Sequence, residues 1–338
     1  MIIDIFVYLI LFSALTAVLL GWWFYRRVRL NRWQSLSLKI LQIRIPRANE
    51  DHNDPLKEIN LTEQLFNSLS SINAPFVFEL AVRNIGEEIG FFLAVPRRHL
   101  DFAKRTIQGL FLDARVEETP DYTIFQPQGV AVAGYLQTEK SDLLPITTYQ
   151  EAQADIFGPI LSTLSRIREA DEGASLQLVV RPVDKKVKKD FLFALDQLKK
   201  GVKFSRVASL GELSAKNVYK ILADAFKNKD KDEPSAPSAE TEEMIKAVSL
   251  KMAKPLFMIN ARVITSSLEQ SRADALFLAL SGSLTKFASP LRNNFKLYKP
   301  KKIKPLIFDY VFREFNKKQR LVLNTEEMAS IFHLPTAT

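Results

Sequence analysis

Basic and aromatic residues alternate along residues 292–320, and their chemistry suits a polyanion. The segment has ten Lys or Arg against two Asp or Glu, with six Phe or Tyr between them. Lysine and arginine neutralise phosphates, so this pattern is typical of segments that bind a nucleic-acid backbone. The alternative is a solvated basic loop leading into an element whose aromatic residues are core. The candidate contact residues for nucleic acid or a protein partner are Lys296, Lys299, Lys301, Lys302, Lys304, Lys317, Lys318 and Arg320.

Catalytic chemistry has no comparable support in the sequence. The chain lacks cysteine, which excludes thiol catalysis and cysteine-based zinc sites, and the histidines His52, His99 and His333 have no metal-ligand spacing. The sequence also has no Walker phosphate-binding loop, no dinucleotide-binding glycine motif and no G-x-S-x-G nucleophile elbow. We therefore expect a protein that is not an enzyme, with no catalytic residue, cofactor or metal ion.

A pair of arginines at the start of a predicted helix is a further candidate for anion binding. Pro96, Arg97, Arg98 and His99 precede an apolar helical stripe. The free N–H groups of a helix N-terminus attract anions, and two arginines would add to this attraction. Ordinary solvation of a helix cap is the simpler explanation of the same residues.

An uncharged stretch of 19 residues, Ile5 to Trp23, predicts a transmembrane helix. At about 1.5 Å per residue it is roughly 28 Å long, close to the thickness of a bilayer core. Residues 26–47 contain seven Lys or Arg and no acid. The positive-inside rule therefore places the N-terminus outside and the body in the cytoplasm, at the inner membrane. The predicted interface residues are Trp22, Trp23, Tyr25, Arg26, Arg27, Arg29 and Arg32.

Hydrophobic periodicity predicts an α+β fold with two α/β lobes after the anchor (residues 1–25) and a basic connector (residues 26–60). The first lobe, residues 61–140, has a helix, a strand hairpin, a second helix and further strands. Its β-β-α-β order is that of a ferredoxin-like unit. The second lobe, residues 141–322, starts with a capping box at Thr148 and repeats this logic.

Single elements are predicted within these lobes from local patterns. Thr123–Phe125 reads as a short strand, one helix follows Thr148, and residues 212–227 read as a lysine-rich helix. Residues 227–242, rich in charge, Pro, Ser and Ala, predict a disordered insertion. A last helix in residues 323–338 starts at Asn324, with acids in its first turn. We expect it to be a junction to a domain that is missing or separate, in a chain that is either full-length or an N-terminal half.

Four segments resemble a membrane-anchored domain of unknown function from candidate-phylum bacteria. They are residues 91–125, 144–150, 172–182 and 323–336, and the last, with N-T-E-E-x-A-S-x-F-H-x-P-T, is the most specific. In that family the domain precedes an FtsK/HerA-type ATPase of type IV secretion and conjugative DNA transfer. The resemblance implies a region that helps such a motor assemble at the membrane. No nucleotide-binding residue is carried over, because the chain has no ATPase motif.

The sequence therefore favours a non-catalytic, membrane-anchored accessory module of a DNA-translocating ATPase supplied in trans or from a split gene. The expected partners are this P-loop ATPase, inner-membrane lipids, further copies of the chain in a homo-oligomer, and DNA. The alternative is a stand-alone membrane-tethered protein that binds nucleic acid through the basic 292–320 segment.

Overall fold

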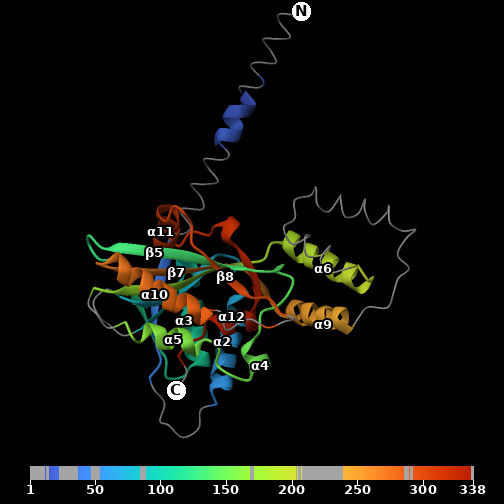
Figure 1. Ribbon diagram of the computed structural model, residues 1–338, viewed down its shortest axis with the longest axis horizontal. Coiled ribbons are helices and arrows are strands. Elements are labelled where there is room, and N and C mark those ends of the chain that lie inside the picture. Colours follow the sequence, from blue (N-terminus) through green and yellow to red (C-terminus); the bar gives the residue numbers. More distant parts are fainter. Residues whose placement is uncertain are drawn as a thin grey trace, which may run out of the picture.

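The computed structural model has a mixed α/β fold built around one large antiparallel sheet, with helices against both of its faces (Figure 1). Every pairing between named strands is antiparallel in the part of the chain that the structure describes. The described residues are 12, 15–22, 37–46, 54–83, 89–167, 171–202, 204, 207, 239–284, 289 and 292–335.

The order of the strands in the sheet is β4-β1-β3-β2-β6-β7-β5-β8 among the described residues. A short ninth strand, β9, pairs with the first part of β7, while β5 pairs with the rest of β7. The strands are β1 (Leu38–Arg44), β2 (Phe76–Val82), β3 (Gly90–Pro96), β4 (Arg115–Thr119), β5 (Val130–Thr138), β6 (Gly173–Pro182), β7 (Leu256–Ser267), β8 (Phe295–Tyr298) and β9 (Leu321–Asn324).

Two stretches of chain build equivalent halves of this sheet. In the first half, β1, α2 (Pro55–Leu69), β2, β3, α3 (Leu100–Leu110) and β4 form the strand order β4-β1-β3-β2. The second half repeats this with the order β8-β5-β7-β6, and its helices are α4 (Tyr149–Ala152), α5 (Gly158–Leu164) and α10 (Gln270–Ser283). Both halves thus have the β-α-β-β-α-β arrangement of a split β-α-β unit.

The second strands of the two halves, β2 and β6, pair with each other and join the halves into one sheet. Glu79 and Gln177 form the central pair of this register. All seven residues of β2 are buried, so the seam has a covered face on each side. Because neither half presents a free edge here, the two halves share their cores instead of meeting as separate domains.

The sheet separates a large core from a smaller one. Alternate residues of β7, including Phe257, Ile259 and Val263, face the large core, which α2, α3, α10 and α12 (Thr325–Ile331) cover. The opposite face is covered by α11 (Lys304–Val311), whose Leu306 and Tyr310 pack there. This alternation places polar residues of the strands beneath α11.

A pair of helices packs beside the sheet. α6 (Lys185–Lys199) and α9 (Ala239–Ala253) contact each other (Figure 1) and form a separate cluster with Met258 of β7 and Val322 of β9. The predicted helix at residues 212–227 lies outside the described residues. Most of the predicted insertion 227–242 does as well, but its last residues belong to α9.

Local side-chain chemistry explains where the structure departs from the predicted elements. β1 and the start of α2 lie in the range assigned to the basic connector, and Asp54 caps α2 by accepting a hydrogen bond from the Leu56 N–H at 3.0 Å. Thr123–Phe125 is not a strand, because the Thr123 hydroxyl accepts from the Phe125 N–H. Gln153, with a φ of 50°, ends α4, so the helix predicted after Thr148 is broken.

The predicted membrane anchor falls mostly outside the described residues. Phe12 and residues 15–22 of the span are described, and they are helical. No helix among the described residues is both long and apolar enough to cross a membrane. Of the predicted interface residues, Trp22 is described, whereas Trp23, Tyr25, Arg26, Arg27, Arg29 and Arg32 are not.

Candidate functional site

The predicted basic residues lie along β8, α11 and the turn that precedes β9. Lys296 is in β8, Lys299 follows it, and Lys304 is the first residue of α11. Their side chains are exposed, as are those of Lys301, Lys302, Lys317 and Lys318. Arg320 is half-buried against Met258. Lys299 pairs with Asp274 at 2.8 Å, so part of the positive charge of this segment is already neutralised.

Helix α11 exposes aromatic rings beside these lysines. The side chains of Phe308 and Phe312 are 39% and 36% exposed, and their ring centroids are 4.4 Å apart. Tyr310, on the other side of the helix, is buried against the sheet. Some aromatic rings of the segment are therefore core, whereas others form an apolar surface among lysines.

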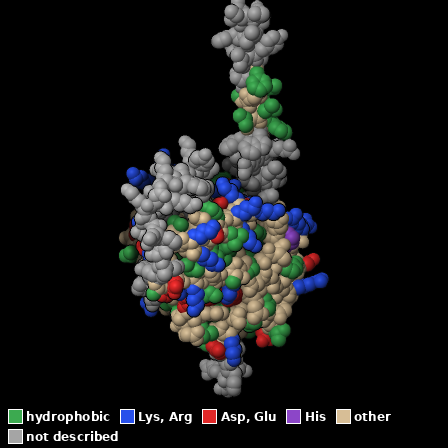
Figure 2. Space-filling model, turned by 90° about the vertical axis from the view of Figure 1, so that its right-hand side faces the viewer, with side chains coloured by type: hydrophobic (Ala, Val, Ile, Leu, Met, Phe, Trp, Pro, Cys, Tyr) green, Lys and Arg blue, Asp and Glu red, His purple; other side chains and the backbone are tan. Residues whose placement is uncertain are grey.

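The exposed face of α11 adjoins the point where the chain enters the body. Leu38, the first residue of β1, lines a cavity of about 670 Å³ together with Val311 and Phe312. Lys and Arg side chains gather on the part of the body below the N-terminal helix, with hydrophobic side chains between them (Figure 2). A basic and apolar surface therefore lies next to Leu38, the first residue of β1.

A buried row of polar side chains on the sheet holds α11 in place. The residues Glu79, Gln177 and Arg262 sit opposite one another on β2, β6 and β7. Gln177 donates to a carboxylate oxygen of Glu79 at 2.7 Å and accepts from Arg262 at 2.8 Å. Gln177 also donates to the backbone carbonyl of Tyr310, and Arg262 donates to that of Asp309, at 2.9 Å each. Burial lowers the pKa of Arg262 to about 10, still well above neutral pH.

The residue after the α11 cap completes this row. Arg313 has a φ of 53°, a left-handed conformation that helices commonly adopt just beyond their C-terminus, usually with glycine. Its guanidinium lies between Glu79 and Asp121, with hydrogen bonds of 3.0 and 2.9 Å. Burial alone would lower the pKa of Arg313, but the two carboxylates raise it above its ordinary value. The ion pairs thus hold the strained residue and keep it charged.

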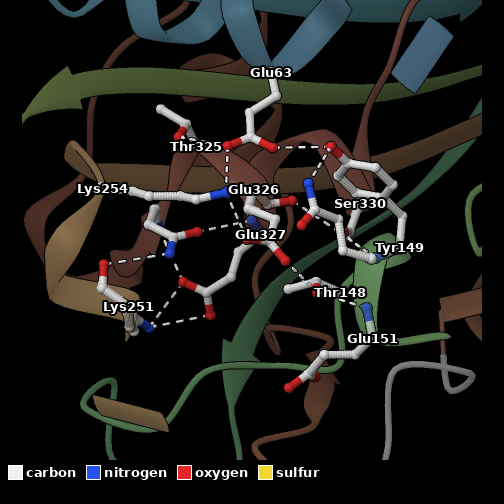
Figure 3. A network of polar contacts seen from close by, with 12 residues as sticks. Glu63, Thr148, Tyr149, Glu151, Lys251, Lys254, Thr325, Glu326, Glu327 and Ser330 are labelled. Carbon is white, nitrogen blue, oxygen red and sulfur yellow. Dashed lines mark hydrogen bonds and ion pairs between the residues drawn. The ribbon is translucent and has the colours of Figure 1, made fainter. Parts of the chain in front are cut away.

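A second polar network surrounds the start of α12 (Figure 3). The Asn324 side chain accepts from the Glu327 N–H at 2.8 Å, and the Glu327 carboxylate accepts from the Asn324 N–H at 2.9 Å, which is a capping box. The same carboxylate accepts from the Ile146 N–H at 2.9 Å and from Lys251 at 3.2 Å. Burial raises the pKa of Glu327, while Lys251 and the N–H groups oppose this rise.

The network extends to three further elements. Lys254 donates to Glu63 of α2 and to Glu326 of α12, at 2.6 Å each. Tyr149 of α4 donates to the other oxygen of Glu63 at 2.9 Å, and the burial of Tyr149 raises its pKa. These contacts connect α2, α4, α9 and α12, as Figure 3 shows. Because these side chains bind one another, the arrangement is suited to fixing the four helices against each other.

The described residues contain no group of three or more Asp, Glu or His that could hold a metal ion.

A family model described as a domain of unknown function (DUF8128) matches residues 41–338. The chain belongs to this family. No curated protein matches the chain.

The DUF8128 match begins inside β1 and therefore covers nearly the whole sheet. The most specific of the quoted segments, residues 323–336, is β9 and α12, whose residues Asn324 and Glu327 are buried in the second network. The helix expected to be a junction is thus packed inside the domain, against α2. Its acids do more than offset a helix dipole, since one of them forms a fully buried ion pair.

No pattern along the chain predicts that the central residues of either network are buried together. Glu79 is the one charged residue in the apolar run of β2, and Arg262 is the one charged residue of β7. A charge in an otherwise apolar buried strand requires a partner, which is a usable signal. The identity of the partner could not be predicted from local patterns, because Glu79 and Arg313 are 234 residues apart.

The DUF8128 domain has a pH-sensitive contact at the end of α12. Asp155 accepts hydrogen bonds from the Phe157 and Gly158 N–H groups at 2.8 Å each, and lies 3.0 Å from His333. Burial alone would raise the pKa of Asp155, but the hydrogen bond and charge of His333 and the two N–H groups lower it.

We expect Asp155→Ala to lower the free energy of unfolding by about 1–2 kcal/mol at pH 7, because the N–H groups lose their acceptor. The pKa of Asp155 is depressed in the folded state, so its contribution is present above about pH 4 and is lost as the pH falls through the folded pKa. Urea unfolding of the wild type and the variant between pH 3 and 7 measures this. A difference that stays constant down to pH 3 would contradict the assignment.

Proposed function

We propose that this DUF8128 chain is a non-catalytic, membrane-anchored module that assembles a translocation ATPase at the inner membrane. The observation that carries the membrane part is the exposure of apolar side chains in the described N-terminal helix. Leu15, Val18, Leu20 and Trp22 are each more than half exposed. Exposed apolar area costs about 25 cal/mol per Å² in water, so a run of such residues requires a cover, and lipid is the cover that this helix fits.

The body lies on the cytoplasmic side in this proposal, because basic residues follow the anchor. The exposed face of α11 supports the same orientation. Lys301, Lys302 and Lys304 are exposed beside Phe308 and Phe312, and the face adjoins Leu38. Each basic residue near an anionic membrane surface contributes about 1 kcal/mol of attraction, and aromatic rings favour the interface.

The proposed partner is a P-loop ATPase of the type IV secretion class, supplied as a separate chain or from a split gene. This rests on the resemblance of the segments that include residues 323–336, and on the two closed polar networks, which fix a rigid body without catalytic geometry. Copies of the chain would surround the motor as a homo-oligomeric collar. In that arrangement the domain supplies position and the motor supplies the chemistry.

Recovery of partners from membranes tests this function. We expect the tagged full chain, solubilised from the native membrane after cross-linking, to recover a P-loop ATPase. The charge-reversed variant Lys301→Glu, Lys302→Glu, Lys304→Glu is expected to stay in the membrane through its anchor but to recover less ATPase, because its acidic face is repelled from the membrane surface at which the motor assembles. A matched control reverses Lys185, Lys186 and Lys188, which are exposed on α6. Recovery of the chain with no P-loop ATPase in any preparation would reject the motor partner.

The interleaved lysines and phenylalanines of α11 also favour a second candidate, in which the tethered chain binds nucleic acid by itself. This candidate predicts that affinity for DNA falls steeply with salt, because phosphate binding releases counterions. Fluorescence anisotropy of the full chain in neutral detergent with labelled DNA, at two salt concentrations, separates the two functions. Binding that is absent, or that is insensitive to salt and to the triple lysine variant, removes the second candidate.

A further inference from the structure

A second cavity lies where the two halves of the sheet meet. It has a volume of about 500 Å³, and its lining includes Pro75 before β2, Pro96 at the end of β3 and Pro182 at the end of β6. Ser37 and Leu38, where the chain enters the body, also line it. Its volume lies in the range of small-molecule pockets, which occur preferentially where two structural units join.

Four arginines and two acids line this cavity. They are Arg97, Arg98, Arg181, Arg313, Asp184 and Glu314. The cavity therefore has an excess of two positive charges. Arginine presents a planar fork of N–H donors, which matches the oxygens of a phosphate group in pairs.

Two of the four arginines are held by neighbours inside the protein. Arg313 is bound to Glu79 and Asp121, and Arg98 donates to His99 at 3.0 Å. Burial and the charge of Arg98 lower the pKa of His99, so its ring is neutral at pH 7 and can accept this hydrogen bond.

The other two arginines have donors left for a ligand. No carboxylate among the described residues pairs with Arg97 or Arg181. The Arg181 guanidinium lies 5.3 Å from the centre of the Phe315 ring, a cation–π contact that orients it without using its N–H groups. The cavity is thus prepared for an anion, with one arginine fixed by stacking and one free to close over it.

We propose that this cavity binds a phosphate group, and that the headgroup of an anionic phospholipid supplies it. The source follows from position. Ser37 is the fourteenth residue after Trp23, so the chain between them spans at most about 50 Å and keeps the cavity within reach of the membrane surface. The lipid source rests on the membrane anchor of the proposed function, whereas the phosphate site itself does not, because binding of a phosphate in detergent solution requires neither a bilayer nor an ATPase.

Calorimetric titration of the full chain in a neutral detergent tests the proposal. The probes are dihexanoyl phosphatidylglycerol, glycerol 1-phosphate and inorganic phosphate, with sodium chloride of equal ionic strength as the reference. We expect the short-chain lipid to bind more tightly than the two soluble phosphates, and both soluble phosphates to compete with it. Arg97→Ala and Arg181→Ala are each expected to weaken binding at least about tenfold, since each removes charge-assisted hydrogen bonds.

Two further variants separate binding from folding. Arg181→Lys keeps the charge but loses the fork and the stacked plane, and it is expected to bind weakly while melting at the wild-type temperature. Arg105→Ala, an exposed arginine of α3 away from the lining, is the matched control and retains full affinity. Wild-type affinity in both Arg97→Ala and Arg181→Ala, or no heat beyond the salt reference, would overturn the site. Binding of glycerol 1-phosphate but not of the lipid would overturn the lipid source.

Discussion

We expect Lys251→Met to lower the free energy of unfolding by about 3–5 kcal/mol, a large part of the total stability of an ordinary domain. Lys251 and Glu327 have side chains with no exposed surface, and they form an ion pair of 3.2 Å. Methionine fills a similar volume but leaves the Glu327 carboxylate charged and buried without its cation. The cost is that of an uncompensated buried charge, and not the small net value of an ion pair.

Chemical denaturation of the full chain in detergent, followed by circular dichroism, measures this effect. Lys39→Met is the matched control, because Lys39 pairs with Glu118 on the surface, where both side chains are nearly half exposed. The control is expected to change the free energy of unfolding by less than about 1 kcal/mol. The double variant Lys251→Met, Glu327→Gln is expected to lose less free energy of unfolding than the two single variants lose together. Equal effects of Lys251→Met and Lys39→Met would show that the buried pair is not formed.

Glu79→Leu, at the seam between the two halves of the sheet, is expected to lower the free energy of unfolding by a similar amount, about 3–5 kcal/mol. Glu79 is 1% exposed and accepts hydrogen bonds from Gln177, Tyr122 and Arg313. Leucine would leave these donors unpaired, and Arg313 would keep only the exposed Asp121 as its partner. The loss of the row also releases α11, whose backbone carbonyls are bound by the neighbouring side chains.

The release of α11 gives this variant a second readout. Limited proteolysis is expected to cut near residues 304–316 faster in Glu79→Leu than in the wild type. Glu117→Leu, an exposed acid of β4, is the control and should alter neither stability nor cleavage. Adding Arg313→Met to Glu79→Leu is expected to recover part of the lost stability, because the mostly buried guanidinium that has lost Glu79 is then removed. A Glu79→Leu protein as stable as the wild type would refute the role assigned to the row.

Local patterns in the sequence predicted the helix α2, the hairpin of β2 and β3 and the helix α3 that follows it. These elements have strong periodicity and clear turns, so neighbours in the sequence decide them. β1 was not predicted, because its seven residues follow a run of arginines and contain Lys39 and Arg44. The sheet itself supplies the missing information, since β1 pairs with β3 and β4.

The candidate surface was partly predictable for the same reason. The lysines between residues 296 and 304 are exposed, as their charge and close spacing in the sequence predict. Which aromatic rings are core and which are surface could not be predicted, because this depends on which side of α11 meets the sheet. The buried ion pairs join residues far apart in the chain, such as Glu63 and Lys254, and single-sequence patterns have no means of pairing them.

The position of β1 inside the sheet has a mechanical consequence. Six residue pairs connect β1 to β3 and five connect it to β4, and the segment that leads from the proposed anchor joins the first residue of this strand. A pull along β1 would load both rows of hydrogen bonds in shear at the same time. A strand at the edge would instead peel away one bond after another. In the proposed arrangement, tension between the motor and the membrane would therefore act on a strand that is hydrogen-bonded on both sides.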